Sequence, residues 1–295
     1  MIKIVEVGPR DGLQNEKSIL STPIKLTFIQ HLLASGLKNI EVTSFVSPKW
    51  VPQMADHSDL IKQLNMDETV TAISLVPNER GLENAIQAGA KAIAVFAAAS
   101  ETFSQKNINC SIDQSIENFK KVIDRAKSKH LWIRGYISCV LGCPYEGEIA
   151  PHQVLSVAER LFEAGCDEVS IGDTIGVGTP QKARNLLKQL KTIIPLEKLA
   201  VHFHDTYGQA LANIYACLEE GITIIDSSVS GLGGCPYAKG ASGNVATEEV
   251  VYMLHGLGLE TGINLDKLIE AGQYICNALQ IQTRSKVAQA LSILQ

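Results

Sequence analysis

The chain has 295 residues, of which 45% are hydrophobic and 19% are charged, and its formal net charge is −5. This apolar fraction can fill a sizeable core, so the composition excludes an intrinsically disordered chain. The 26 Lys and Arg residues form no basic block, which argues against a nucleic-acid partner.

The sequence shows neither a membrane segment nor a targeting segment. Its longest apolar run, at 92–99, has eight residues, whereas a membrane-spanning helix needs about 20. Residues 1–7 enter a strand-like pattern instead of a secretory or transit segment. The seven cysteines are scattered, which is typical of a reduced protein whose thiols pack as small hydrophobic groups. We therefore expect a cytoplasmic protein without a membrane partner.

Short β-branched runs alternate with longer amphipathic runs along the chain. The short runs predict eight strands, at 2–7, 39–43, 70–76, 92–97, 131–138, 168–172, 200–204 and 224–229. Helices are predicted between them, for example at 24–35, 79–88, 112–128, 151–164, 180–193 and 209–220. Several helical runs end in a glycine that suits a left-handed cap, namely Gly36, Gly89, Gly165 and Gly221.

Eight strand–helix units in this length favour an α/β fold of the (β/α)8 TIM barrel type. The strands are nearly continuous apolar runs, as parallel strands covered on both faces are. An open doubly wound sheet would place a dinucleotide-binding turn after its first strand, and residues 8–12 (GPRDG) lack that pattern. No linker divides the chain, so we expect one catalytic domain over residues 1–295. Residues from about 264 to 295 are expected to form extra C-terminal helices packed on the barrel.

Polar residues at strand ends are candidate active groups, because barrel active sites gather there. Arg10 and Asp11 follow the first strand, with Gln14 close behind, although a solvated turn is the more common explanation of an isolated pair. Glu41 lies inside a strand expected to be buried, so it needs a partner. An ion pair with Arg10 would satisfy it. Asp173 ends the sixth strand and is either a functional group or the cap of a turn.

The sequence His202-Phe-His204 ends the seventh strand and is the strongest local signal. Residues i and i+2 of a strand share a face, so the two imidazoles can chelate a divalent cation. Two hydrogen-bonded core histidines are the alternative. Barrel closure would bring Asp11 beside them, and Asn244 could add an amide oxygen. Mixed oxygen and nitrogen donors with open positions favour Mg²⁺ or Mn²⁺ over closed tetrahedral zinc.

The segment 230–247 is rich in glycine and contains Cys235 outside any helix or strand pattern. Such a loop lets the backbone approach a ligand, and a thiol on a closing lid could act as an acid or base. A flexible loop with an incidental cysteine is the alternative. Cys139 and Cys143 lack partners at metal-ligand spacing, so we expect them to be structural.

These motifs resemble the 3-hydroxy-3-methylglutaryl-CoA lyase family, within the metal-dependent lyase and synthase barrels. The similar stretches are GPRDGLQN at 8–15, EVTSFVSPKWVPQM at 41–54, FHDTYGQ at 203–209 and GLGGCPYAKGASGNVATE at 231–248. The RDG and HxHD elements are shared with synthases that condense acetyl-CoA with 2-oxo acids. The glycine-rich loop is more specific to the lyases and favours them.

The resemblance implies a homodimeric carbon–carbon lyase that uses Mg²⁺ or Mn²⁺ to cleave 3-hydroxy-3-methylglutaryl-CoA into acetoacetate and acetyl-CoA. The cation ligands that it implies are Asp11, His202, His204 and Asn244. The catalytic residues are Arg10, Asp11, Glu41, Asp173, His202 and Cys235, with either Asp11 or His202 as the base. The residues near the acyl-CoA substrate are Arg10, Gln14, Asn107, Ser111 and Tyr136. A synthase and a non-enzymatic metal-binding barrel are the alternatives.

Overall fold

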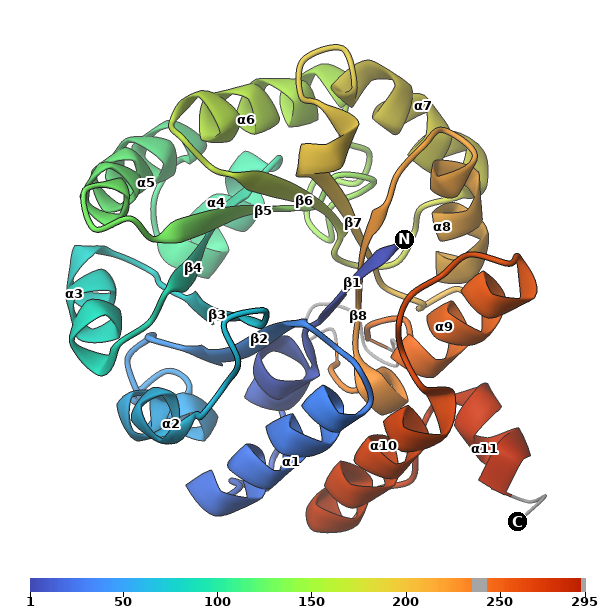
Figure 1. The fold of residues 1–295 in the computed structure, drawn as a ribbon. Coiled ribbons are helices and arrows are strands. Elements are labelled where there is room, and N and C mark those ends of the chain that lie inside the picture. The colour runs from blue at the N-terminus through green and yellow to red at the C-terminus, as the bar shows by residue number, and fades with distance from the viewer. Residues whose placement is uncertain (235–242, 293–295) are drawn as a thin grey trace.

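Eight parallel strands pair in sequence order, and the last strand closes onto the first. The fold was obtained as a computed structural model, which describes residues 1–234 and 243–292. Figure 1 shows the strands at the centre and the helices around them. The strands are β1 (Lys3–Glu6), β2 (Asn39–Ser44), β3 (Thr71–Leu75), β4 (Ala92–Ala98), β5 (Trp132–Ser138), β6 (Glu168–Asp173), β7 (Leu199–Phe203) and β8 (Ile224–Ser227). The predicted (β/α)8 barrel is confirmed.

The helices cover the outside of the barrel. They are α1 (Thr22–Ala34), α2 (His57–Gln63), α3 (Glu79–Ala88), α4 (Glu101–Ile108), α5 (Ile112–Lys127), α6 (Pro151–Glu163), α7 (Pro180–Leu190), α8 (Ala210–Leu218), α9 (Thr247–Gly256), α10 (Leu265–Leu279) and α11 (Lys286–Ser292). Four shorter turns of helix are η1 (Gly8–Gly12), η2 (Pro52–Met54), η3 (Leu196–Lys198) and η4 (Val229–Gly231). All six helices predicted by range are present, with boundaries that differ by a few residues.

Local sequence determines where several of these helices begin and end. Asn78 precedes α3, and its side chain accepts a hydrogen bond from the Gly81 amide at 2.9 Å. The four glycines predicted as caps have φ between 96° and 110°, a region that residues with a Cβ rarely adopt. At Gly36 a Cβ would also lie 2.3 Å from the Gly262 carbonyl oxygen. Glycine is therefore required where α1 ends.

Two of the three buried apolar clusters lie on opposite sides of the strands, as alternation along the strands requires. The larger cluster lies between the strands and the surrounding helices and includes Ile93 and Val95 of β4. The smaller cluster lies inside the barrel and includes their neighbours Ala92 and Ala94. The interior also contains charged side chains, among them Arg134, which is completely buried.

The two C-terminal helices lie outside the eight strand–helix units. Helix α10 packs beside α1, and α11 packs beside α9 (Figure 1). The Asn264 amide donates to the Ser35 carbonyl at 2.7 Å, which ties the start of α10 to the end of α1. The Arg284 amide donates to the Ser230 carbonyl at 3.0 Å. The C-terminal segment thus contacts the chain directly after β8.

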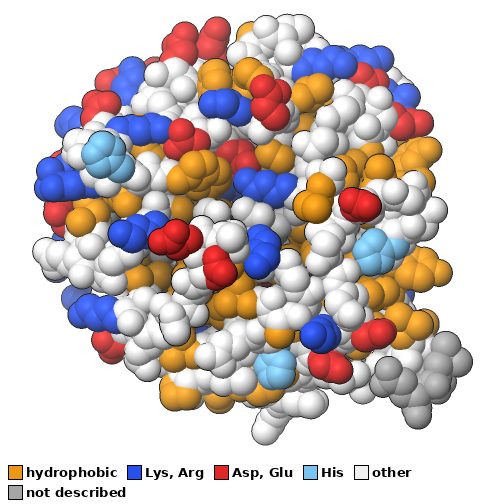
Figure 2. Space-filling model, viewed as in Figure 1, with side chains coloured by type: hydrophobic (Ala, Val, Ile, Leu, Met, Phe, Trp, Pro, Cys, Tyr) orange, Lys and Arg blue, Asp and Glu red, His pale blue; other side chains and the backbone are white. Residues whose placement is uncertain are grey.

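The molecular surface carries charges of both signs. On the face drawn in Figure 2, Lys and Arg side chains are interspersed with Asp and Glu. Within residues 1–234 and 243–292, none of the helices combines the length and the apolar composition that crossing a bilayer requires.

Candidate active site

Arg10 and Asp11 lie in η1, the turn that directly follows β1. The predicted ion pair is present, with Arg10 Nη2 2.7 Å from Glu41 Oε2. Arg10 Nη1 also donates to Asp11 Oδ1 at 3.0 Å. The Glu41 side chain is completely buried and that of Arg10 is nearly so. This buried pairing holds the guanidinium in one direction beside the Asp11 carboxylate.

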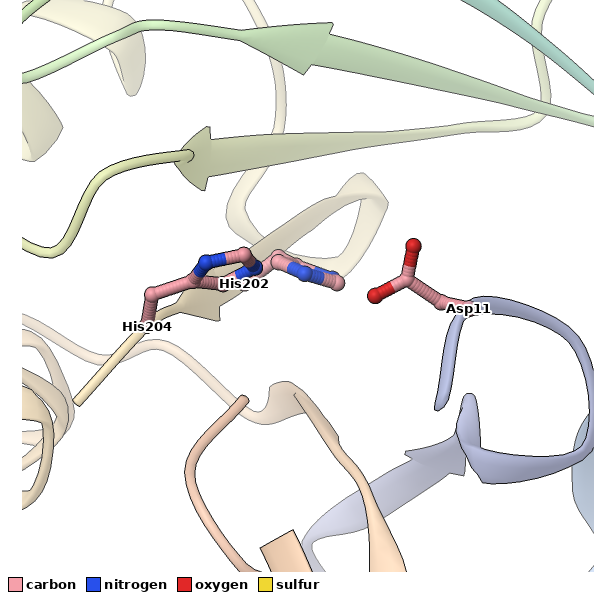
Figure 3. Close-up of side chains that lie close together, drawn as sticks. All are labelled: Asp11, His202 and His204. Carbon is pink, nitrogen blue, oxygen red and sulfur yellow. The ribbon is translucent and has the colours of Figure 1, made fainter. Parts of the chain in front are cut away.

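The structure brings Asp11, His202 and His204 together at the carboxyl ends of the strands. One ligand atom from each residue lies within 4.8 Å of the others, and Figure 3 shows the three side chains facing a common point. The two imidazole rings have centroids 5.5 Å apart. His204 lies one residue beyond the end of β7, where it forms an antiparallel bridge with Asn244. The predicted juxtaposition across the β7, β8 and β1 strands is therefore confirmed.

The protonation states of two members of this cluster, Asp11 and His204, suit a cation. Burial alone would raise the pKa of Asp11, but the charges of Arg10 and the two histidines lower it to about 2. Burial, together with the neighbouring His202, lowers the pKa of His204 to about 4. His204 Nδ1 is also buried without a hydrogen-bond partner among the described residues. An anionic carboxylate beside a neutral imidazole with an unused nitrogen fits a divalent cation.

Asn244 contacts the cluster through its amide nitrogen. Its Nδ2 donates to Asp11 Oδ2 at 2.7 Å and to the Leu232 carbonyl at 3.2 Å. Two acceptors around one atom assign that atom as nitrogen. In this arrangement the Asn244 amide nitrogen orients the Asp11 carboxylate.

A cavity of about 760 Å³ opens above the cluster. The predicted site residues that line it are Arg10, Asp11, Gln14, Asn107, Tyr136, His202 and His204. Its wall also includes the largely exposed indole of Trp50 and the Lys106 side chain, neither of which was predicted. Ser111 is not among the lining residues. Its hydroxyl accepts from the Gln114 amide at 3.1 Å and caps α5.

Asp173 ends β6 as predicted, and its carboxylate faces the backbone of the following loop. It accepts from the Gly178 amide at 2.8 Å and from the Val177 amide at 3.2 Å. Burial raises the pKa of Asp173 to about 6. These contacts agree with the alternative of a turn cap. The predicted catalytic residue Cys235 lies outside the described residues.

Three buried charges inside the barrel escaped the sequence analysis, namely Arg134 on β5, Glu168 on β6 and Asp226 on β8. Arg134 Nε lies 2.9 Å from Glu168 Oε1, and Arg134 Nη2 lies 2.6 Å from Asp226 Oδ1. The sequence does carry a signal for them, because Arg134 and Asp226 interrupt strands expected to be buried, as Glu41 does, and Glu168 begins one.

A (β/α)8 barrel that places an Asp–His–His set at the carboxyl ends of its strands defines a metal-dependent barrel enzyme. The sequence identifies the family within this class of enzymes. The chain matches the HMGL-like family over residues 1–275, and it belongs to that family of metal-dependent enzymes.

Curated relatives and solved structures agree with this assignment. The chain is 57% identical over 289 residues to the mitochondrial hydroxymethylglutaryl-CoA lyase of Rattus norvegicus, covering 98% of this chain and 89% of that protein. It is 58% identical to the cytoplasmic 3-hydroxy-3-methylglutaryl-CoA lyase of the same species, covering 98% and 84%. The crystal structure of hydroxymethylglutaryl-CoA lyase from Pseudomonas aeruginosa matches with a TM-score of 0.98 at 54% identity, covering 100% and 98%.

Proposed function

We propose that the protein is a carbon–carbon lyase that cleaves 3-hydroxy-3-methylglutaryl-CoA into acetoacetate and acetyl-CoA. The observation that supports this most is the Asp11, His202 and His204 cluster beside the buried Arg10–Glu41 ion pair. The cluster and Arg10 line one cavity of about 760 Å³. Relatives that match nearly the whole chain bear the names of this lyase.

The proposed cofactor is Mg²⁺ or Mn²⁺, held by Asp11, His202 and His204 with Asn244 as the fourth proposed ligand. Carboxylate and imidazole donors with room for substrate oxygens suit these cations. When bound there, such a cation supplies Lewis-acid chemistry that favours loss of the substrate hydroxyl proton. As a ligand, Asn244 would bind through its amide oxygen, whereas the contact present in the structure is between its amide nitrogen and Asp11.

The reaction requires a base, a place for the developing charge and a proton donor. Asp11 or His202 takes the proton from the C3 hydroxyl, and both lie in the cluster. The C2–C3 bond then breaks, its electron pair forms the thioester enolate, and acetoacetate is left as the ketone. Arg10, held by Glu41 at 2.7 Å, presents a fixed positive charge to that enolate oxygen.

Protonation of the enolate carbon completes the formation of acetyl-CoA. We assign this proton to the thiol of Cys235, on the glycine-rich segment, as general acid. Gln14, Tyr136 and Asn107 are proposed to contact the acyl-CoA, since all three line the cavity. Asp173 and Ser111 are proposed to act by holding the loop and helix that they cap.

The remaining proposals concern the whole molecule. We propose that residues 1–295 form one catalytic domain and that two copies form a homodimer, which the family resemblance implies. We also propose a cytoplasmic location. It is supported by the scattered cysteines of the sequence, which are typical of a reduced protein, and by the cytoplasmic relative in Rattus norvegicus.

One assay tests the activity. Purified protein is incubated with 3-hydroxy-3-methylglutaryl-CoA and Mg²⁺, and acetoacetate is measured, with a chelator-treated sample as control. Acetoacetate that disappears on chelation supports the lyase. Condensation of acetyl-CoA with a 2-oxo acid and no cleavage would instead identify a synthase, and neither reaction would identify a non-enzymatic metal-binding barrel. Light scattering of the same preparation tests the homodimer.

A further inference from the structure

A buried carboxylate lies directly behind the cation cluster, inside the barrel. Asp226 on β8 is the register partner of His202 on the neighbouring strand β7. Its Oδ2 atom lies 3.1 Å from His202 Nδ1, and its side chain is completely buried. Because both groups stand on paired strands, their contact is fixed by the sheet and does not depend on a loop.

Asp226 is itself held on both oxygens. Ser170 Oγ donates to Oδ2 at 2.8 Å, and Arg134 Nη2 donates to Oδ1 at 2.6 Å. Arg134 is in turn held by Glu168 Oε1, 2.9 Å from its Nε, and it donates to the Tyr136 hydroxyl at 3.2 Å. A completely buried carboxylate with this many partners cannot rotate freely.

The network continues to the far end of the barrel, where Lys3 Nζ lies 2.7 Å from Glu168 Oε2. The two acidic and two basic side chains balance in charge. Such a buried network is costly to desolvate, and apolar side chains of similar size would fill the space at lower cost. Of these four side chains (Lys3, Arg134, Glu168 and Asp226), Asp226 is the one that forms a hydrogen bond with a residue of the cation cluster. That contact distinguishes Asp226 from Glu168, which shares Arg134 but not the histidine.

We propose that Asp226 is a positioning residue that orients His202 for cation binding, and that Arg134 and Ser170 hold it in place. The carboxylate accepts the Nδ1–H of His202, which leaves Nε2 as the nitrogen that can bind the cation. With both nitrogens of His202 used in this way, Asp11 is the residue that takes the substrate proton. A histidine ligand whose other nitrogen donates to a carboxylate is fixed in both tautomer and ring orientation. This inference rests on the proposed function, because it assumes that the cluster binds a cation.

The first experiment compares two variants that differ in their contact with His202. Mn²⁺ is titrated calorimetrically into the wild-type protein, Asp226→Asn and Glu168→Gln. We expect Asp226→Asn to bind Mn²⁺ roughly 10- to 100-fold more weakly. We expect Glu168→Gln to lose much less affinity, because Glu168 contacts Arg134 and not His202, although both variants lose a charged partner of Arg134 and unfold at lower temperature. Equal affinities in all three proteins, or equal losses in the two variants, would overturn the proposal.

The second experiment needs no variant at position 226 and therefore stands if Asp226→Asn does not fold. Histidine labelled with ¹⁵N is incorporated into the wild-type protein, and the cation-free sample is measured by NMR at alkaline pH. His202 is assigned by the signal missing from His202→Gln. We expect protonation on Nδ1 rather than Nε2, and the opposite tautomer would contradict the proposal. Failure of the wild-type protein to bind Mn²⁺ would refute the cation site instead, while the tautomer would still report on Asp226.

Discussion

Replacing Arg10 with glutamine separates the chemical role of this residue from its structural role. The substitution removes the charge proposed to stabilise the enolate, and it also leaves Glu41 without its partner at 2.7 Å. Loss of one transition-state donor costs about 10²- to 10³-fold in kcat. Leaving a buried charge unpaired costs about 3–5 kcal/mol of folding free energy. We therefore expect Arg10→Gln to be both slow and less stable.

The double variant Arg10→Gln/Glu41→Gln removes both charges of the pair and resolves the two effects. Without an unpaired carboxylate, most of the lost stability should return, but kcat should stay low because no positive charge faces the enolate. Arg125→Gln is the matched control. Arg125 pairs with Glu83 at 2.9 Å between two helices, and both side chains are about half exposed, so we expect little change in either quantity.

The measurements are kcat from acetoacetate release under saturating Mg²⁺, the urea midpoint of unfolding, and the affinity for Mn²⁺. We expect Arg10→Gln to bind Mn²⁺ nearly as well as the wild-type protein, since Arg10 is not a proposed ligand. A double variant that regains kcat along with stability would show that Arg10 acts only by supporting the fold. An Arg10→Gln enzyme with near-normal kcat would equally refute the role at the enolate.

Three further predictions follow from individual residues. His204→Ala should weaken Mn²⁺ binding by more than the roughly 10- to 100-fold that loss of a partner behind a ligand costs. Calorimetric titration with Mn²⁺ checks this, and His152→Ala is the control because His152 is exposed. Equal affinities of His204→Ala and the wild-type protein would exclude His204 as a ligand. Burial raises the pKa of Glu248 from 4.5 to about 8, so the folded state keeps a proton that the unfolded chain releases, and stability should fall as pH rises from 4.5 to 8. Glu248→Gln should flatten this decline in melting temperature relative to the wild-type protein, and parallel profiles would contradict the assignment. Cys235→Ala should reduce turnover while leaving acyl-CoA affinity intact, and unchanged turnover would make the thiol incidental.

The sequence by itself determined the barrel, because the signals for it are local. Alternating strand and helix periods do not depend on distant residues, and the glycines that follow α1, α3, α6 and α8 are required by their own backbone angles. The pair of histidines two residues apart was equally visible, since a strand places both on one face. The ion pair of Glu41 could be predicted because a charge within a buried strand needs a partner, and Arg10 is that partner in the structure.

The tertiary structure decided which distant residues meet and in what orientation. Closure of β8 onto β1 brings Asp11 to within reach of histidines that lie almost two hundred positions away in the sequence. It also decided that Asn244 presents nitrogen to Asp11 and that Asp173 faces loop amides. The contact between His202 and Asp226 arises from the register of two neighbouring strands. These contacts between distant side chains depend on strand register and on barrel closure. A periodic pattern within one segment of the sequence predicts neither.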